Sequence, residues 1–243
     1  MYVDCRHCPL RRTSAFRPLE GEELDFVRSI KFEQSSFPAR VDVITAGEAS
    51  PMLFTLFSGW AFRYMMLDGR VRQIMDVLLP GDLVGLQSPI TGRIRHSVRS
   101  ITPVSLCLLD GEGFRALFEG YPELSEALVA TLLYEEHRAD TRLLLLGRLR
   151  PTQRLAYLFL ELFDRLSRRG HAEEDSCELP LTYEHLADLI GVSRSQVGAS
   201  LLDLKQRGWA TLAEGRLTVL DRAQMAAGSR YQALPDPAIR ALI

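Results

Sequence analysis

The chain has 243 residues, of which 47% are hydrophobic and 25% charged, and its formal net charge at pH 7 is −2. This length supports one large domain or two ordinary ones with a substantial core. The charge balance excludes a protein that attracts nucleic acid through overall charge, although a local basic patch is sufficient for DNA binding.

The sequence contains no segment typical of export or membrane insertion. No apolar run approaches the roughly 18 to 20 residues that cross a bilayer, and residues 1–16 lack the apolar core of a signal peptide. We therefore expect a cytoplasmic protein with no membrane partner. In that compartment disulfides are rare, so we interpret the cysteines first as free thiols, metal ligands or redox groups.

The first half of the chain is predicted to form an arm, a short helix and a small antiparallel roll. Residues 1–18 are polar, and residues 20–30 have apolar positions at helical spacing. From about 31 to 110, short runs rich in Val, Ile, Phe and Thr alternate with glycine turns, which is typical of strands. Asp68-Gly69 predicts a hairpin with a type I′ turn.

A long helix is predicted from 121 to 148. Its sequence has one opening proline and apolar residues every three or four positions. A helix of this length with an apolar stripe commonly pairs with its copy, so we expect dimerisation through it. Gly147 and Pro151 are expected to form a hinge before a second helix at 152–170, followed by a polar connector.

The stretch LTYEHLADLIGVSRSQVGASLLDLKQRGWATLAEGRLTVLD, residues 181–221, predicts a helix-turn-helix with a wing. Thr182 is expected to cap the first helix, Gly191 to end it in a left-handed conformation, and Ser193 to cap the second helix. Val197, Leu201 and Leu204 are expected to face inward. Such a unit offers its second helix to the major groove of DNA.

The residues that we expect to contact DNA are Ser193, Arg194, Ser195, Gln196, Ser200, Lys205 and Arg207. Residues 180–230 hold six Lys and Arg against five Asp and Glu. Because this surplus is small, strong binding requires two copies on a two-fold symmetric site.

The order of roll, long helix, hinge and winged helix-turn-helix resembles the Crp/Fnr superfamily of bacterial transcription regulators over nearly the whole chain. The stretches SGWAFRYMMLDGRVRQIMDVLLPGDLVGLQ and LADLIGVSRSQVG carry the resemblance. The implied fold is α+β, with an N-terminal antiparallel β-roll like a cyclic-nucleotide-binding domain. We expect a cysteine arm at 1–18, the sensor roll at 19–120, a dimerisation helix at 121–147 and the DNA-binding domain at 148–243.

The resemblance implies a homodimer that binds promoter DNA, works with RNA polymerase and responds to a redox or oxygen-linked signal. No nucleophile elbow, P-loop or paired carboxylate indicates an enzyme. The alternative is a ligand-binding sensor or adaptor that acts through protein partners without specific DNA binding, which the small charge surplus of the C-terminal part favours.

Two departures from the family pattern change its implications. The family's nucleotide-binding turn reads Gly81-Asp82-Leu83 here, without the Arg-Ser pair that holds the phosphate, so a cyclic nucleotide is not expected. In the second helix, Ser195 and Ala199 stand where the family commonly has Glu and Arg. We therefore expect a different half-site, read chiefly by Arg194 and Gln196.

The Fnr branch binds an iron–sulfur cluster through three arm cysteines and one roll cysteine. Cys5, Cys8 and Cys107 match three of these positions, whereas the fourth holds Ser14. The resemblance therefore implies an iron–sulfur cluster completed by another group, such as Asp4 or His7.

Other uses of these cysteines stay open at the level of sequence. They include a zinc site with His7, a haem bound at Cys8-Pro9, and a thiol switch in which Cys5 and Cys8 form a disulfide. A further alternative is a buried Cys107 beside an arm that binds nothing. Cys177 is expected to be a lone thiol.

Overall fold

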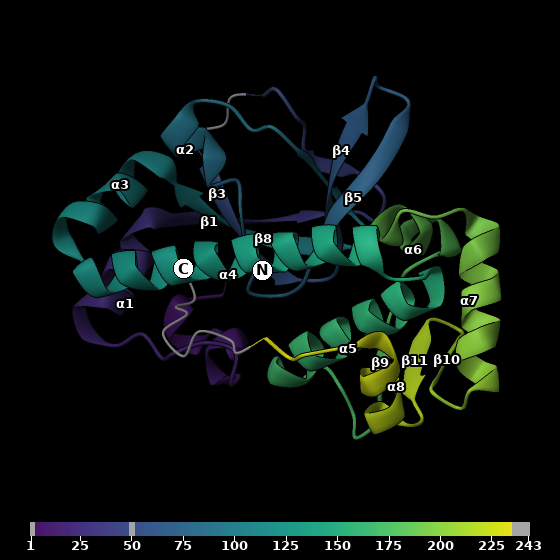
Figure 1. Ribbon diagram of the computed structural model, residues 1–243. Helices are drawn as coiled ribbons and strands as arrows, with labels where there is room; N and C mark the ends of the chain where they lie inside the picture. Colours follow the sequence, from purple (N-terminus) through teal and green to yellow (C-terminus); the bar gives the residue numbers. More distant parts are fainter. Residues whose placement is uncertain (1–2, 49–51, 235–243) are drawn as a thin grey trace. The chain divides into compact units, whose positions relative to one another are not determined.

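The computed structural model describes residues 3–48 and 52–234, and the chain forms two compact units that divide at Tyr134 and Glu135, inside one long helix (Figure 1). None of the helices in these two stretches is both long and apolar enough to span a bilayer. The last nine residues of the expected DNA-binding domain, 235–243, lie outside the described residues.

The first unit is an antiparallel roll built from two four-stranded sheets, in the orders β1-β8-β3-β6 and β2-β7-β4-β5. Asp68 and Gly69 join β4 to β5 with positive φ values of 50° and 66°, which confirms the predicted turn. The strands are β1 (Lys31–Phe37), β2 (Asp42–Ile44), β3 (Met52–Ser58), β4 (Ala61–Leu67), β5 (Val71–Leu78), β6 (Leu83–Val84), β7 (Ser97–Ser100) and β8 (Val104–Asp110).

Alternation along β8 gives its two faces different roles. Leu106 and Leu108 enter the core between the two sheets, whereas Leu109 enters a second core that also contains residues of the flanking helices. Cys107 shares the outer face with Leu109. The helices of this unit are η1 (Cys5–His7), η2 (Pro9–Arg12), α1 (Gly21–Ile30), α2 (Gln87–Thr91) and α3 (Gly111–Gly120).

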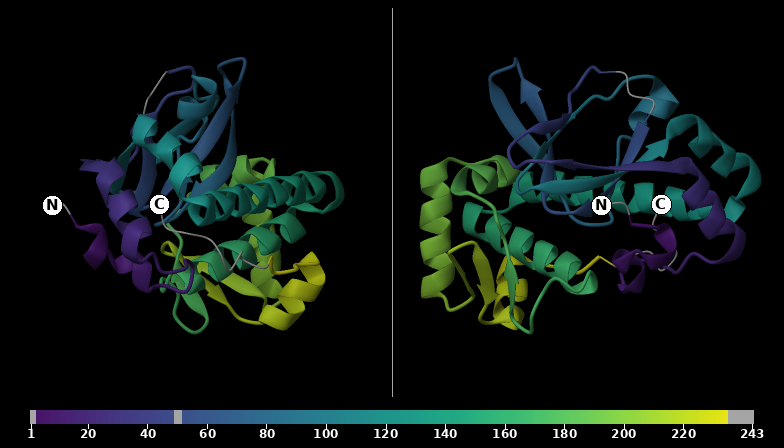
Figure 2. Two further views of the ribbon diagram at one scale, coloured as in Figure 1. Left: turned by 90° about the vertical axis from the view of Figure 1, so that its left-hand side faces the viewer. Right: turned by 180° about the vertical axis from the view of Figure 1, so that it is seen from behind.

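The N-terminal arm is ordered against α1 and the outer face of the roll, and η1 lies beside α1 (Figure 2). Ion pairs of 3.1 Å between Arg28 and Asp4 and of 3.2 Å between Arg6 and Asp25 join the two segments. Leu10 and Phe16 are buried at 6% and 7% exposure. The arm is therefore a packed part of the unit.

The long helix α4 (Pro122–Arg148) runs unbroken, so the expected interruption at Gly147 is wrong. Gly147 is helical, and the chain turns at Leu149 and Arg150 because Pro151 begins α5 (Pro151–Arg168) and cannot donate a helical hydrogen bond. Large apolar residues of α4 are exposed, namely Val129, Leu132, Leu133, Leu143 and Leu144.

The second unit is a winged helix-turn-helix whose core centres on α5, where Phe159, Leu160 and Leu162 are fully buried. Its other elements are β9 (Ser176–Glu178), α6 (Tyr183–Ile190), α7 (Arg194–Gln206), β10 (Ala210–Ala213), β11 (Arg216–Val219) and α8 (Arg222–Ser229). The predicted polar connector before α6 contains β9, which completes a sheet in the order β10-β11-β9. This strand was not predicted, because charged residues precede it.

Candidate nucleic-acid interface and a thiol pocket

The turn between α6 and α7 forms as the sequence predicts. The Thr182 side chain accepts a hydrogen bond from the His185 amide, and the Ser193 side chain accepts one from the Gln196 amide, so both helices are capped. Gly191 ends α6 with a φ of 66°. A β-carbon there would lie 3.1 Å from Leu146 Cδ2, so glycine suits both the backbone and the packing.

One face of α7 is buried and the other is open to solvent. Val197, Ser200 and Leu204 face inward, whereas Arg194 and Gln196 are exposed. The expectation that Ser200 contacts DNA is therefore wrong, because its side chain lies with the buried residues at 3% exposure. Ser200 takes the inward place expected for Leu201, which is only half-buried.

The side chains at the start of α7 form a small hydrogen-bond network. The Ser193 amide donates to Gln196 Oε1 at 2.9 Å, and the Gln196 amide donates to Ser193 Oγ at 3.3 Å. Ser193 Oγ also lies 2.9 Å from Ser195 Oγ. Arg194 stands outside this network and has no hydrogen-bond or ion-pair partner among the described residues. Its guanidinium keeps all its donors for another molecule.

Two basic residues at the far end of α7 differ in whether their charged groups have partners within the described chain. Arg207 donates to Asp203 at 2.7 Å and lies 5.1 Å over the Trp209 ring. Lys205 is exposed and makes no such contact within the described chain. Lys205 therefore presents an unpaired charge, whereas the guanidinium of Arg207 is fixed by Asp203 and Trp209.

Arg154 was not predicted as a site residue, yet it joins three parts of this unit. Its guanidinium donates to the carbonyls of Leu149 at 2.8 Å, Leu146 at 2.6 Å and Ile190 at 3.1 Å. It therefore connects the turn between α4 and α5 to the end of α6. Backbone carbonyl acceptors leave no mark in a sequence, so no motif could have identified this contact.

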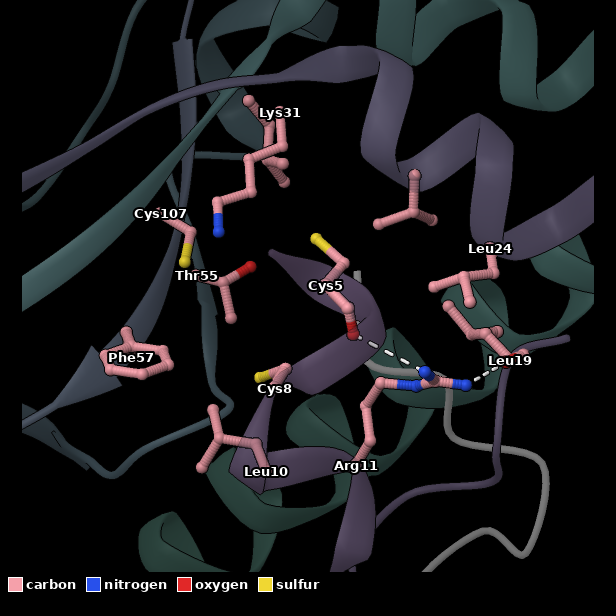
Figure 3. A pocket seen from close by; sticks show the side chains of 12 residues that line it. Cys5, Cys8, Leu10, Arg11, Leu19, Leu24, Lys31, Thr55, Phe57 and Cys107 are labelled. Carbon is pink, nitrogen blue, oxygen red and sulfur yellow. Dashed lines mark hydrogen bonds between the residues drawn. The ribbon is translucent and has the colours of Figure 1, made fainter. Parts of the chain in front are cut away.

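Three cysteines come together in one small pocket of the first unit, between the arm and the outer face of the roll (Figure 3). Cys5 and Cys8 come from the arm, and Cys107 comes from β8. All three side chains point into a cavity of about 40 Å³ that is otherwise mostly apolar. The match of their positions to the Fnr branch predicted this grouping.

Lys31 supplies a buried positive charge in the same pocket. Its side chain is 6% exposed, and its Nζ donates to the Val3 carbonyl at 2.6 Å. Burial raises the pKa of Cys107, and the nearby Lys31 ammonium, which hydrogen-bonds Cys107, opposes this rise. Burial likewise raises the pKa of Cys5, again against the charge of Lys31. Lys31 was not predicted as a member of the site.

The pocket as described does not fit an iron–sulfur cluster. The described residues contain no group of three or more His, Cys, Asp or Glu side chains placed to hold a metal ion, which also disfavours zinc with His7. A cavity of about 40 Å³ has room for only a few water molecules, and not for a cluster or a haem.

The nucleotide-binding turn of the roll is occupied by its own contacts. Asp82 is 4% exposed, and its carboxylate accepts a hydrogen bond from the Leu79 amide at 2.8 Å. This carboxylate stabilises the turn, so its geometry gives no support to a role in binding a ribose.

Two family models match the chain. A Crp-like helix-turn-helix domain covers residues 153–227, and a cyclic nucleotide-binding domain covers residues 34–121. The transcriptional activator protein FnrL of Cereibacter sphaeroides is 29% identical over 220 residues, which are 89% of this chain and 87% of the relative. A CRP-like cAMP-activated global transcriptional regulator of Mycobacterium tuberculosis is 27% identical over 224 residues, 91% of this chain and 98% of the relative.

Among solved structures, FixK2 from Bradyrhizobium japonicum superposes with a TM-score of 0.72. The match covers 84% of this chain and 98% of that structure at 23% identity, so it establishes the fold alone.

Proposed function

The chain belongs to the Crp/Fnr family of DNA-binding transcription regulators, and from this premise we propose how its residues carry out regulation. It binds a two-fold symmetric promoter site as a homodimer in the cytoplasm, with α7 of each copy in the major groove, and works with RNA polymerase. It is not an enzyme, and its response is to a redox signal at the thiol pocket.

The observation that carries the DNA-binding proposal is the state of Arg194. It occupies the first position of a capped helix, is exposed, and spends no donor on the described part of the chain. Arginine in such a place donates two hydrogen bonds to guanine O6 and N7. Lys205, at the other end of α7, supports the proposal as a free charge for a phosphate.

The exposed apolar residues of α4 support the homodimer. Leu143 is 71% exposed and Leu144 is 61% exposed on this helix. A second copy of α4 would bury such side chains, and it would also double the small positive surplus of the winged unit. The two half-sites would then lie one or more helical turns of DNA apart.

The redox response is proposed to use the thiols themselves. A two-electron oxidant takes two electrons and two protons from Cys5 and Cys8, and a bond forms between the two sulfur atoms. This change alters the arm at the point where it covers the pocket. The altered packing then shifts the balance between DNA-binding and non-binding dimers.

A salt titration of DNA affinity tests the proposal against a protein-binding adaptor. Because phosphate contacts release counterions, the logarithm of the affinity for promoter duplex falls linearly with the logarithm of salt concentration. The experiment compares duplex that carries the selected site with scrambled duplex. A specific site bound no more tightly than scrambled DNA would favour the adaptor.

A further inference from the structure

The side-chain amide of Gln196 has only one of its two ends free. The Ser193 backbone amide points at it from 2.9 Å, and a backbone amide can only donate. The atom that receives this bond is therefore the carbonyl oxygen Oε1, which also accepts from Ser193 Oγ at 3.1 Å. The NH2 end, Nε2, has no partner among the described residues, and Gln196 is exposed.

A glutamine that reads adenine needs both ends, because its oxygen accepts from adenine N6 while its nitrogen donates to N7. Here the oxygen is part of the cap of α7. Turning it toward DNA would break the hydrogen bond from the Ser193 amide, which is one of the two reciprocal bonds of the cap, and would leave that amide without this partner.

The neighbouring side chain of Arg194 adds further hydrogen-bond donors and no acceptor. The nearest carboxylate of α7 is Asp203, which accepts from Arg207 at 2.7 Å. Ser195 Oγ is within hydrogen-bond distance of Ser193 Oγ. The free groups of Arg194 and Gln196 therefore donate, and neither offers an acceptor to a base.

We propose that Gln196 determines specificity as a donor and selects a guanine, which presents O6 and N7 as acceptors in the major groove. Thymine offers one acceptor there, O4, and cytosine presents the N4 donor, so the order of preference is guanine, then thymine, with cytosine last. Adenine is not expected to bind more tightly than thymine, because the free groups of Gln196 and Arg194 offer no acceptor to its N6 donor. This inference rests on the proposed function, since it requires α7 in the groove.

The test combines site selection with two substitutions at one position. The wild-type protein is used to select its site from random duplexes, and affinities are then measured on duplexes that carry each base at every half-site position. Gln196→Ala should remove discrimination at one position, a loss of roughly 5- to 100-fold between guanine and cytosine. Gln206→Ala, at the other end of the same helix, is the matched control and should leave the preference unchanged.

Gln196→Glu is the second arm of the test. Glutamate keeps an oxygen for the Ser193 amide, as in the usual capping box, so the helix start is retained. Its free end is an acceptor, and the preference should move from guanine to cytosine or adenine, the bases that present a donor. Circular dichroism confirms that the fold is kept.

The outcomes distinguish a failure of the proposed function from a failure of the inference about Gln196. A protein that selects no sequence at all would overturn the proposed function. A protein that selects a specific site but prefers adenine at the position sensitive to Gln196 would overturn the inference alone, as would unchanged discrimination in Gln196→Ala.

Discussion

The ring of Phe16 packs directly onto the backbone of Gly81, so that a β-carbon at position 81 would lie only 2.1 Å from Phe16 Cζ. Phe16 belongs to the arm, and Gly81 belongs to the turn between β5 and β6 of the roll. Gly81 also has a φ of 94°, a conformation that other residues rarely adopt. This contact fixes the arm over the pocket that contains Cys5, Cys8 and Cys107.

Gly81→Ala is therefore expected to loosen the arm. Backbone strain alone costs about 1–3 kcal/mol, and the Phe16 ring must also move. Cys5 and Cys8 should then react faster with iodoacetamide in the native state, as measured by mass spectrometry of timed samples. Gly69→Ala is the matched control, because Gly69 also has a positive φ but a β-carbon there would meet no described atom within 4 Å. Equal thiol reactivity in the two variants would show that the contact does not hold the arm.

Leu143→Glu should weaken the homodimer. Leu143 is 71% exposed in the single chain, so the substitution is expected to change the stability of the fold by less than about 0.5 kcal/mol. In a dimer it would bury two charges without partners, which is unfavourable. Sedimentation equilibrium should show a monomer, whereas Leu202→Glu, at an exposed leucine of α7, should stay dimeric. A dimer of unchanged stability in Leu143→Glu would mean that this part of α4 is not the interface.

His96 should make the stability depend on pH. Burial, and then the charge of Arg63, lowers the pKa of His96 from 6.5 to about 4. Between these values the unfolded chain binds a proton that the folded chain does not, so stability is lost as pH falls from 6.5 toward 4. The loss is on the order of 3 kcal/mol.

Urea unfolding at a series of pH values measures this effect, and the difference between wild type and His96→Asn isolates it from the carboxylates. The slope of the unfolding free energy against pH should flatten in His96→Asn. It should persist in His137→Asn, since His137 is exposed on α4. An identical slope in all three proteins would contradict the assignment.

Mild oxidation with diamide should join Cys5 to Cys8 and change DNA affinity. Peptide mapping by mass spectrometry should show that the peptide with Cys5 and Cys8 has lost the mass of two hydrogen atoms. Dithiothreitol should restore both thiols. Cys177 is an internal reference, because burial raises its pKa to about 11 and keeps it a protonated, unreactive thiol. Cys177→Ala should respond like the wild type, whereas a Cys5→Ser variant that still responds would exclude the proposed disulfide.

The winged helix-turn-helix was predictable because its caps and turns depend on local chemistry. Thr182, Gly191 and Ser193 are residues whose side chains or backbone freedom define helix ends, and each does so in the structure. The turn at Glu214 and Gly215 was predictable for the same reason, with φ values of 51° and 74°.

Contacts between distant residues could not be predicted in this way. The burial of Ser200 depends on how α7 packs, and the place of Lys31 among the thiols depends on how the arm folds over β1 and β8. The spacing of Cys5 and Cys8 indicated a cofactor or redox site, and the resemblance to the Fnr branch implied an iron–sulfur cluster there. Only the three-dimensional arrangement shows an ammonium group beside the sulfur atoms.

Selection of binding sites from random duplexes by the wild type and by Arg194→Ala tests the central claim, that two copies of α7 read bases through their first turn. The wild type should enrich a two-fold symmetric sequence. Arg194→Ala should remain dimeric and folded but lose roughly 1–3 kcal/mol of discrimination at one position of each half-site. Enrichment of the same sequence, with the same preference at every position, by both proteins would contradict the account.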